Sequence, residues 1–239
     1  MMAFGDLWRS APSFISGLWL TLQLTAIPLL AGLALAIPLS VMRISSQRMW
    51  STPVAFFTYI MRGTPMLAQL MIVYYGLGQL QWLQQMWAQG HPVWLLLRDP
   101  YYCALLAFTL NTCAYTTEIL AGALRAIPSG EVEAARAVGM SKSMALRRVL
   151  LPSALRRSLP AYGNEVIFML HGSAVASVVT IVDLTGAARD LYANFYAPFE
   201  AFVAAGTVYL ALSMGLTWLF GRLERRYMRF LQPRSSLSH

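Results

Sequence analysis

The stretch 128–160 organises the rest of the chain, and it reads PSGEVEAARAVGMSKSMALRRVLLPSALRRSLP. A helix is expected to start at Ser129, and Gly139 follows its last turn, where glycine takes a left-handed cap at little cost. Ser141 then caps a second helix, which Pro152 is expected to interrupt because proline lacks a backbone N–H. The pattern therefore predicts two short amphipathic helices joined by a turn at Gly139.

The second of these helices mixes cations with apolar residues. Lys142, Arg147 and Arg148 lie among methionine, leucine and valine residues over 142–150. On pattern alone, one interpretation is a basic helix that lies on lipid headgroups.

The composition is that of a protein that crosses a membrane several times. Of the 239 residues, 57% are hydrophobic and 12% are charged, whereas a soluble domain carries about 25% charged residues. Cys103 and Cys113 lie in one apolar segment, where a helix points them in different directions, so a disulfide between them is not expected. We interpret both as small buried hydrophobic residues.

Five apolar segments are long enough to cross a bilayer, which takes about 20 residues in a helix. They are 14–42, 52–78, 101–124, 161–182 and 199–221. Pro65 lies inside the second segment and is expected to open its hydrogen-bond ladder. The predicted fold class is therefore all-α: a polytopic membrane protein of one domain over 1–239, with five transmembrane helices and a charged helical loop at 125–160.

The basic residues predict the orientation, because cytoplasmic loops are enriched in lysine and arginine. The 42–51 loop holds two, the 125–160 loop seven and the C-terminal tail five, against three in the loops on the other side. This excess of basic residues, fourteen on one side against three on the other, predicts a periplasmic N-terminus and a cytoplasmic C-terminus. The formal charge of +8 is then explained by topology and contact with anionic membrane lipid, with no need for nucleic acid.

The sequence offers little for catalysis. It contains no G-x-x-x-x-G-K-[ST] motif, so we do not expect this chain to bind ATP through a P-loop. The three histidines are scattered, which predicts no metal site. No nucleophile lies beside a base, and we therefore expect no catalytic residue and no cofactor in this chain.

Polar residues inside the spans are costly in lipid and usually face a pore or a partner. Asn111, Tyr115 and Glu118 recur at helical spacing in the third span. His171 lies about 15 Å into the fourth span, near the midplane. We assign these four residues to a substrate pathway; hydrogen bonding between helices is the alternative role.

Glu118 and Glu165 are the carboxylates of the third and fourth spans. We expect Glu118 to be the acid that faces a cationic substrate, because it shares a helical stripe with Asn111. Glu165 is close in sequence to the cytoplasmic loop, and an alternative role for it is to brace that loop through Arg156 or Arg157.

One part of the loop resembles a family motif. Glu133-Ala134-Ala135, then Gly139, then Leu151-Pro152 resembles the EAA loop of ABC importer permeases, with Val149 where isoleucine is commoner. The resemblance implies that the loop is cytoplasmic and docks in a cleft of an ATPase subunit. The docking residues that it implies are Glu133, Ala134, Ala135, Gly139, Leu151 and Pro152.

Further segments are similar to the polar amino-acid permeases, in particular to their histidine and lysine/arginine/ornithine branch. They are the stretches 62–65, 111–118, 151–156, 160–166 and 169–171. The resemblance covers nearly all of the chain from about residue 55 to about residue 230.

The resemblance implies a permease half of an ATP-driven importer in the bacterial inner membrane that carries histidine, arginine, lysine or ornithine. It also implies a second permease subunit in a heterodimer, two ATPase subunits that hold ATP and magnesium, and a periplasmic substrate-binding protein. Octopine, nopaline or glutamine are alternative substrates within the family. A self-contained carrier or channel, and a membrane enzyme using Glu118 and His171, are alternatives from other classes. The long charged loop favours the importer, since neither alternative needs it.

Overall fold

The computed structural model describes residues 11–90 and 96–228, and this part of the chain forms helices and no strand. The long helices are α2 (Ala11–Arg43), α7 (Pro100–Arg125), α10 (Leu151–Gly172) and α12 (Pro198–Tyr227). The shorter ones are α3 (Arg48–Gly63), α4 (Met66–Met71), α5 (Gln81–Ala88), α8 (Ser129–Ala137), α9 (Lys142–Ala145) and α11 (Leu184–Phe195). The predicted all-α class is confirmed.

The helices α2, α7 and α12 are each long and apolar enough to cross a bilayer. A fourth candidate consists of two segments, Lys142–Val179 and Leu184–Phe195, which meet at an angle of 48°. The number of five crossings stays a prediction.

The second expected span, 52–78, is not one helix. Helix α3 ends at Gly63, Thr64 and Pro65 are extended with ψ of 144° and 136°, and α4 begins at Met66. Pro65 has no N–H to donate to the preceding turn, and the residue before a proline avoids the helical region. The chain therefore breaks here, and the helical path beyond α4 continues as a π-helical turn, η1 (Ile72–Gly76), and a short 3-10 turn, η2 (Leu77–Gln79).

The fourth expected span, 161–182, begins earlier than the sequence suggests. The expected interruption at Pro152 is wrong: a π-helical turn, η3 (Leu146–Leu150), joins α9 to α10, and Pro152 lies in the first turn of α10. Proline costs little at such a position because its missing N–H would have had no partner in a first turn. The helix reaches Gly172, and a 3-10 stretch, η4 (Ser173–Val179), follows it.

The core forms where α2 crosses α7, with α4, α10 and η4 packed around the crossing. Gly32 of α2 permits this approach, because a Cβ there would lie 3.1 Å from the Cys113 nitrogen of α7. Gly17 plays the same part against α11, where a Cβ would lie 2.8 Å from the Asp183 carbonyl oxygen. Cys103 and Cys113 are both free and buried, as predicted.

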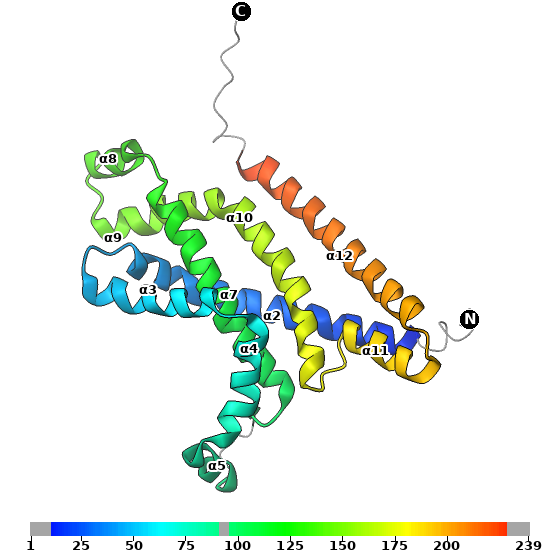
Figure 1. Ribbon diagram of the computed structural model, residues 1–239. Helices are drawn as coiled ribbons and strands as arrows, with labels where there is room; N and C mark the ends of the chain where they lie inside the picture. Colours follow the sequence, from blue (N-terminus) through cyan, green and yellow to red (C-terminus); the bar gives the residue numbers. More distant parts are fainter. Residues whose placement is uncertain (1–10, 91–95, 229–239) are drawn as a thin grey trace, which may run out of the picture.

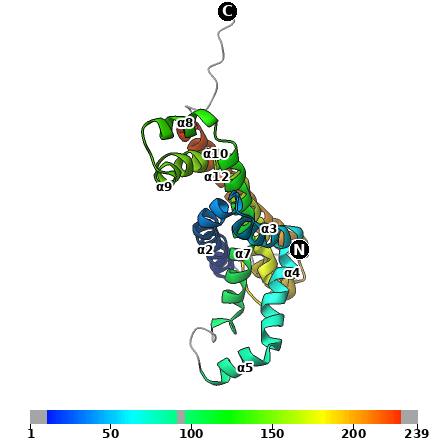
Figure 2. The same cartoon turned by 90° about the vertical axis from the view of Figure 1, so that its left-hand side faces the viewer.

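Figures 1 and 2 show how the elements spread to the two ends of the bundle. The α2–α3 connection, the α8–α9 segment and the last turns of α12 lie toward one side, and α5 and α11 lie toward the other (Figure 1). Helices α10 and α12 run side by side, and the Phe220 ring of α12 packs directly on Gly163 of α10.

Candidate functional site

A cavity of about 520 Å³ opens where α3 breaks, beside α7 and α10. Three segments far apart in the sequence line it: the break itself, the middle of α7 and the second half of α10. The lining residues are Arg62, Gly63, Thr64, Pro65, Met66, Asn111, Tyr115, Glu165, Phe168 and Met169.

The Gln69 side chain holds the break in place. Its amide nitrogen lies 2.7 Å from the Met61 carbonyl oxygen and 3.1 Å from the Thr64 carbonyl oxygen. The amide thus satisfies carbonyls that lose their helical partners where α3 ends. Its oxygen accepts a hydrogen bond from the Asn111 amide nitrogen at 3.0 Å, which ties α7 to the break.

Gln69 was absent from the predicted site. Its signal in the sequence is a polar amide four residues after Pro65, in an otherwise apolar segment. A buried amide in lipid needs partners, and the carbonyls freed by the break supply them.

Arg62 is the cation in the cavity lining, and it stacks on an aromatic ring rather than pairing with an acid. Its guanidinium carbon lies 5.4 Å from the ring centroid of Tyr115, whose hydroxyl donates to the Arg62 carbonyl oxygen at 3.3 Å. Within residues 11–90 and 96–228, no carboxylate forms an ion pair with Arg62. The guanidinium is therefore available to an anionic group of a ligand.

Glu165 is the carboxylate in the lining. It is 6% exposed, and Thr112 of α7 donates a hydrogen bond to it at 2.8 Å. As with Arg62, the described residues offer it no ion-pair partner. The role of bracing the loop through Arg156 or Arg157 does not hold, because Glu165 faces α7 and Arg157 pairs with Glu131.

The structure places Glu118 outside this lining. The Arg43 Nε atom of α2 lies 2.6 Å from Glu118 Oε1, and the Thr58 hydroxyl of α3 donates to the same oxygen at 2.7 Å. Glu118 therefore joins α2, α3 and α7 in one ionic cluster, and its place in the substrate pathway stays an untested prediction.

This cluster gives a stability prediction. Glu118→Gln leaves Arg43 without its anion in a site where the two side chains are 27% and 16% exposed. We expect the substitution to lower the unfolding free energy by about 1–3 kcal/mol, since the remaining charge stays partly buried. Thermal unfolding of the purified protein measures it, with the double variant R43Q/E118Q as the control. The loss of unfolding free energy in the double variant should be smaller than the sum of the losses in E118Q and R43Q alone. A loss equal to that sum would contradict the pairing.

His171 also lies outside the cavity lining. Its Nε2 atom is 2.8 Å from the Ser213 hydroxyl oxygen, which links α10 to α12. Of the four residues assigned to the pathway, the cavity brings together Asn111 and Tyr115, and His171 and Glu118 face other helices.

The predicted local structure of the loop is confirmed at its turn. Helix α8 begins at Ser129, and Gly139 adopts a φ of +76° two residues after its end. The Ser141 side chain accepts a hydrogen bond from the Met144 N–H at 3.3 Å and caps α9.

The predicted docking residues differ in exposure. Glu133, Ala134 and Gly139 are exposed, whereas Ala135 is buried. Leu151 and Pro152 are half-buried at the start of α10. Docking through all six is not tested by this arrangement and stays a prediction.

The turn gives a second prediction. If the α8–α9 segment docks an ATPase subunit, as the sequence resemblance implies, Gly139→Val should reduce recovery of that subunit with this chain at least about fivefold, because a β-branched residue at this φ costs about 1–2 kcal/mol and re-aims α9. Copurification from detergent-solubilised membranes measures the recovery. Gly130→Val is the matched control, because Gly130 lies in α8 with open space at its Cβ position and no positive φ. Equal recovery with both variants would contradict the role given to the turn.

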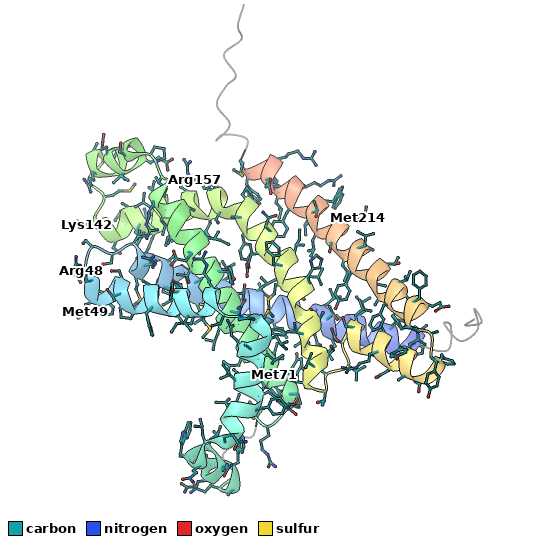
Figure 3. The ribbon with its side chains drawn as sticks, in the orientation of Figure 1. Arg48, Met49, Met71, Lys142, Arg157 and Met214 are labelled. Carbon is teal, nitrogen blue, oxygen red and sulfur yellow. The ribbon has the colours of Figure 1, made fainter. Side chains whose placement is uncertain are left out.

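An ion pair fastens α8 to α10. The Arg157 Nη2 atom lies 2.8 Å from Glu131 Oε1, and the Ser153 hydroxyl donates to Glu131 Oε2 at 2.8 Å. Figure 3 shows Arg157 on α10, at the end of the bundle that carries α8. We call Glu131, Ser153 and Arg157 the α8 brace.

A family model for the inner membrane component of binding-protein-dependent transport systems matches residues 29–229. The chain is 44% identical over 230 residues to the histidine/lysine/arginine/ornithine transport system permease protein HisM of Escherichia coli (strain K12), covering 96% of this chain and 94% of that protein. It is 41% identical over 220 residues to the octopine transport system permease protein OccM of Rhizobium radiobacter, covering 91% of this chain and 87% of that protein.

The solved structures include a crystal structure of an amino acid ABC transporter with histidines. It matches this chain with a TM-score of 0.80 and 32% identity, over 95% of this chain and 99% of that one.

Proposed function

Because the chain belongs to the family of inner membrane components of binding-protein-dependent transport systems, we propose that it is the permease subunit of an ATP-driven importer for a basic amino acid. Histidine, lysine, arginine and ornithine are the expected substrates. The observation that carries the proposal is the cavity, whose lining holds one cation, Arg62, and one buried carboxylate, Glu165, neither of which forms an ion pair with a described residue.

The chemistry of the lining matches a basic amino acid. The guanidinium of Arg62 suits the α-carboxylate, since the two planar groups form paired hydrogen bonds. Glu165 suits a cationic group of the substrate, which would cost several kcal/mol unpaired inside a membrane. Asn111 and Tyr115 add a polar contact and an aromatic face. We therefore propose Glu165, rather than Glu118, as the acid of the pathway.

The likeness to OccM makes an opine the alternative substrate. Octopine carries two carboxylates, whereas the described lining holds one cation, Arg62. This count favours a substrate with one carboxylate.

The remaining subunits follow from the family. We propose that a second permease covers the open side of the cavity, where Arg62 and Thr64 are exposed in the single chain. Two ATPase subunits would dock on the α8–α9 segment and hydrolyse ATP, and a periplasmic binding protein would deliver the substrate. The charge asymmetry supports a periplasmic N-terminus and a cytoplasmic C-terminus.

The α8 brace supports a route from ATP hydrolysis to the cavity. Helix α10 extends from Leu151 to Gly172, with Pro160 inside it, and carries both Arg157 of the brace and Glu165 of the cavity. A movement of α8 imposed by the ATPase would therefore reach the cavity through this one helix and change which side is open.

Uptake by the native bacterium tests the proposal. Deletion of this chain should abolish high-affinity uptake of labelled arginine or histidine, and the intact chain on a plasmid should restore it. Unlabelled lysine should compete, and octopine should compete poorly. Unchanged basic amino-acid uptake in the deletion strain would contradict the proposed function.

A further inference from the structure

A second hollow lies between α2, α10 and α12, on the other side of α10 from the cavity. It has a volume of about 390 Å³. Apart from Thr25 its lining is apolar and includes Leu22, Leu170, Leu212, Gly215 and Leu219. The Thr25 hydroxyl already donates to the Thr21 carbonyl oxygen at 2.8 Å. The groove therefore fits an apolar occupant with no hydrogen bonds to satisfy.

The side of α12 that lines the groove ends in cations. Leu212, Gly215 and Leu219 are spaced by three and four residues, and the same spacing continues to Arg222 and Arg226. Both arginines are exposed, and in the described part of the chain neither forms an ion pair. The stripe of α12 that lines the groove thus passes from apolar to cationic within one turn.

Trp218 indicates the depth in the membrane at which α12 changes from apolar to cationic residues. The Arg222 guanidinium carbon lies 4.0 Å from the ring centroid of Trp218, which is 56% exposed. Tryptophan is enriched where hydrocarbon meets headgroups. The pair therefore places a guanidinium at headgroup depth beside the mouth of the groove.

The length of the groove matches one leaflet. From Ala211 to Leu219 the α12 wall extends about 12 Å, against about 15 Å for half of the hydrocarbon core. Arg222 lies about 5 Å beyond, where a lipid phosphate sits.

We propose that this groove binds one acyl chain of an anionic phospholipid, whose phosphate is held by Arg222 and Arg226. A packed protein helix would explain the apolar walls but not the two cations that continue them, which form no ion pair with a described residue. The site is independent of the substrate cavity and of the amino acid carried.

Native mass spectrometry of the intact importer complex tests the proposal, with phosphatidylglycerol and phosphatidylcholine of the same acyl chains as probes. Wild type should retain phosphatidylglycerol preferentially. The double variant R222Q/R226Q should weaken that binding about thirtyfold, from about fivefold for each arginine. Arg225→Gln is the matched control, since Arg225 lies off the stripe and donates to the Gly221 carbonyl oxygen.

A second variant tests the groove itself by filling it with a side chain. Nothing lies within 4 Å of a Cβ at Gly215, so Gly215→Leu would place its side chain in the groove without displacing protein atoms. It should abolish retention of the lipid, whereas Gly206→Leu, at an equally open position outside the groove, should not.

Three results would overturn the proposal. They are equal retention of both lipids by wild type, unchanged retention in R222Q/R226Q or in Gly215→Leu, and loss of the second permease from the Gly215→Leu complex. The last result would make the occupant a protein.

Discussion

Replacing Glu165 with glutamine is expected to lower ATP-dependent uptake of arginine by about a hundredfold. Glu165 is the carboxylate of the described cavity lining, so the variant leaves the substrate guanidinium without an anion there. An uncompensated charge within a membrane span costs about 3 kcal/mol, which corresponds to about a hundredfold.

The measurement is uptake into proteoliposomes that contain the complete importer. Citrulline is the informative comparison, because it has the shape of arginine with a neutral end. Uptake of citrulline relative to arginine should rise in Glu165→Gln, and ATPase stimulation by the binding protein should persist. A variant that carries arginine as well as wild type would remove Glu165 from the pathway.

Reversing the charge of the α8 brace is expected to uncouple ATP hydrolysis from transport. In Arg157→Glu two carboxylates face each other where a 2.8 Å ion pair joined α8 to α10. The side chains of the pair are 21% and 33% exposed, so solvent screens the pair and the static loss is about 1 kcal/mol. Repulsion adds to this loss and frees α8 from α10, and we expect uptake to fall at least about tenfold while ATP hydrolysis continues.

Two variants separate coupling from charge. Arg156→Glu makes the same change at the neighbouring exposed residue, which forms no ion pair with a described residue, and should transport nearly normally. The exchange E131R/R157E restores opposite charges and should recover much of the transport. Failure of the exchange, together with a deficit in Arg156→Glu, would show that charge at this surface matters and the pair does not.

The structural features that could be predicted from the sequence are those that depend on residues close together in the sequence. Ser129, Gly139 and Ser141 were placed correctly because caps and left-handed turns depend on a few adjacent residues. The stripe of Asn111 and Tyr115 was placed on one side of α7 by its helical spacing, and both line the cavity.

Glu118 shows where that reasoning ends. It continues the stripe by one turn, but periodicity gives the side of a helix and not the residues that face it. Arg43 and Thr58, from helices more than fifty residues away, occupy that position.

Glu165 was misplaced for a different reason. Its neighbourhood was assigned from a span expected to begin at residue 161, whereas α10 begins at Leu151. Ten further residues of helix amount to about 15 Å, which moves Glu165 from the end of a span to the cavity. The sequence reasoning missed the π-helical turn before Pro152, through which the chain stays helical from α9 into α10.

Protection of a cysteine in the cavity by substrate tests the central claim most directly. Met66 lines the cavity and Met49 lies exposed at the start of α3 (Figure 3), so Met66→Cys is the probe and Met49→Cys its control. The natural cysteines are buried. In the assembled importer with its binding protein and ATP, arginine should slow modification of the cysteine at position 66 by a thiol reagent at least about fivefold, and leave position 49 unchanged. An equal rate at position 66 with and without arginine, in a complex that still transports it, would contradict the account.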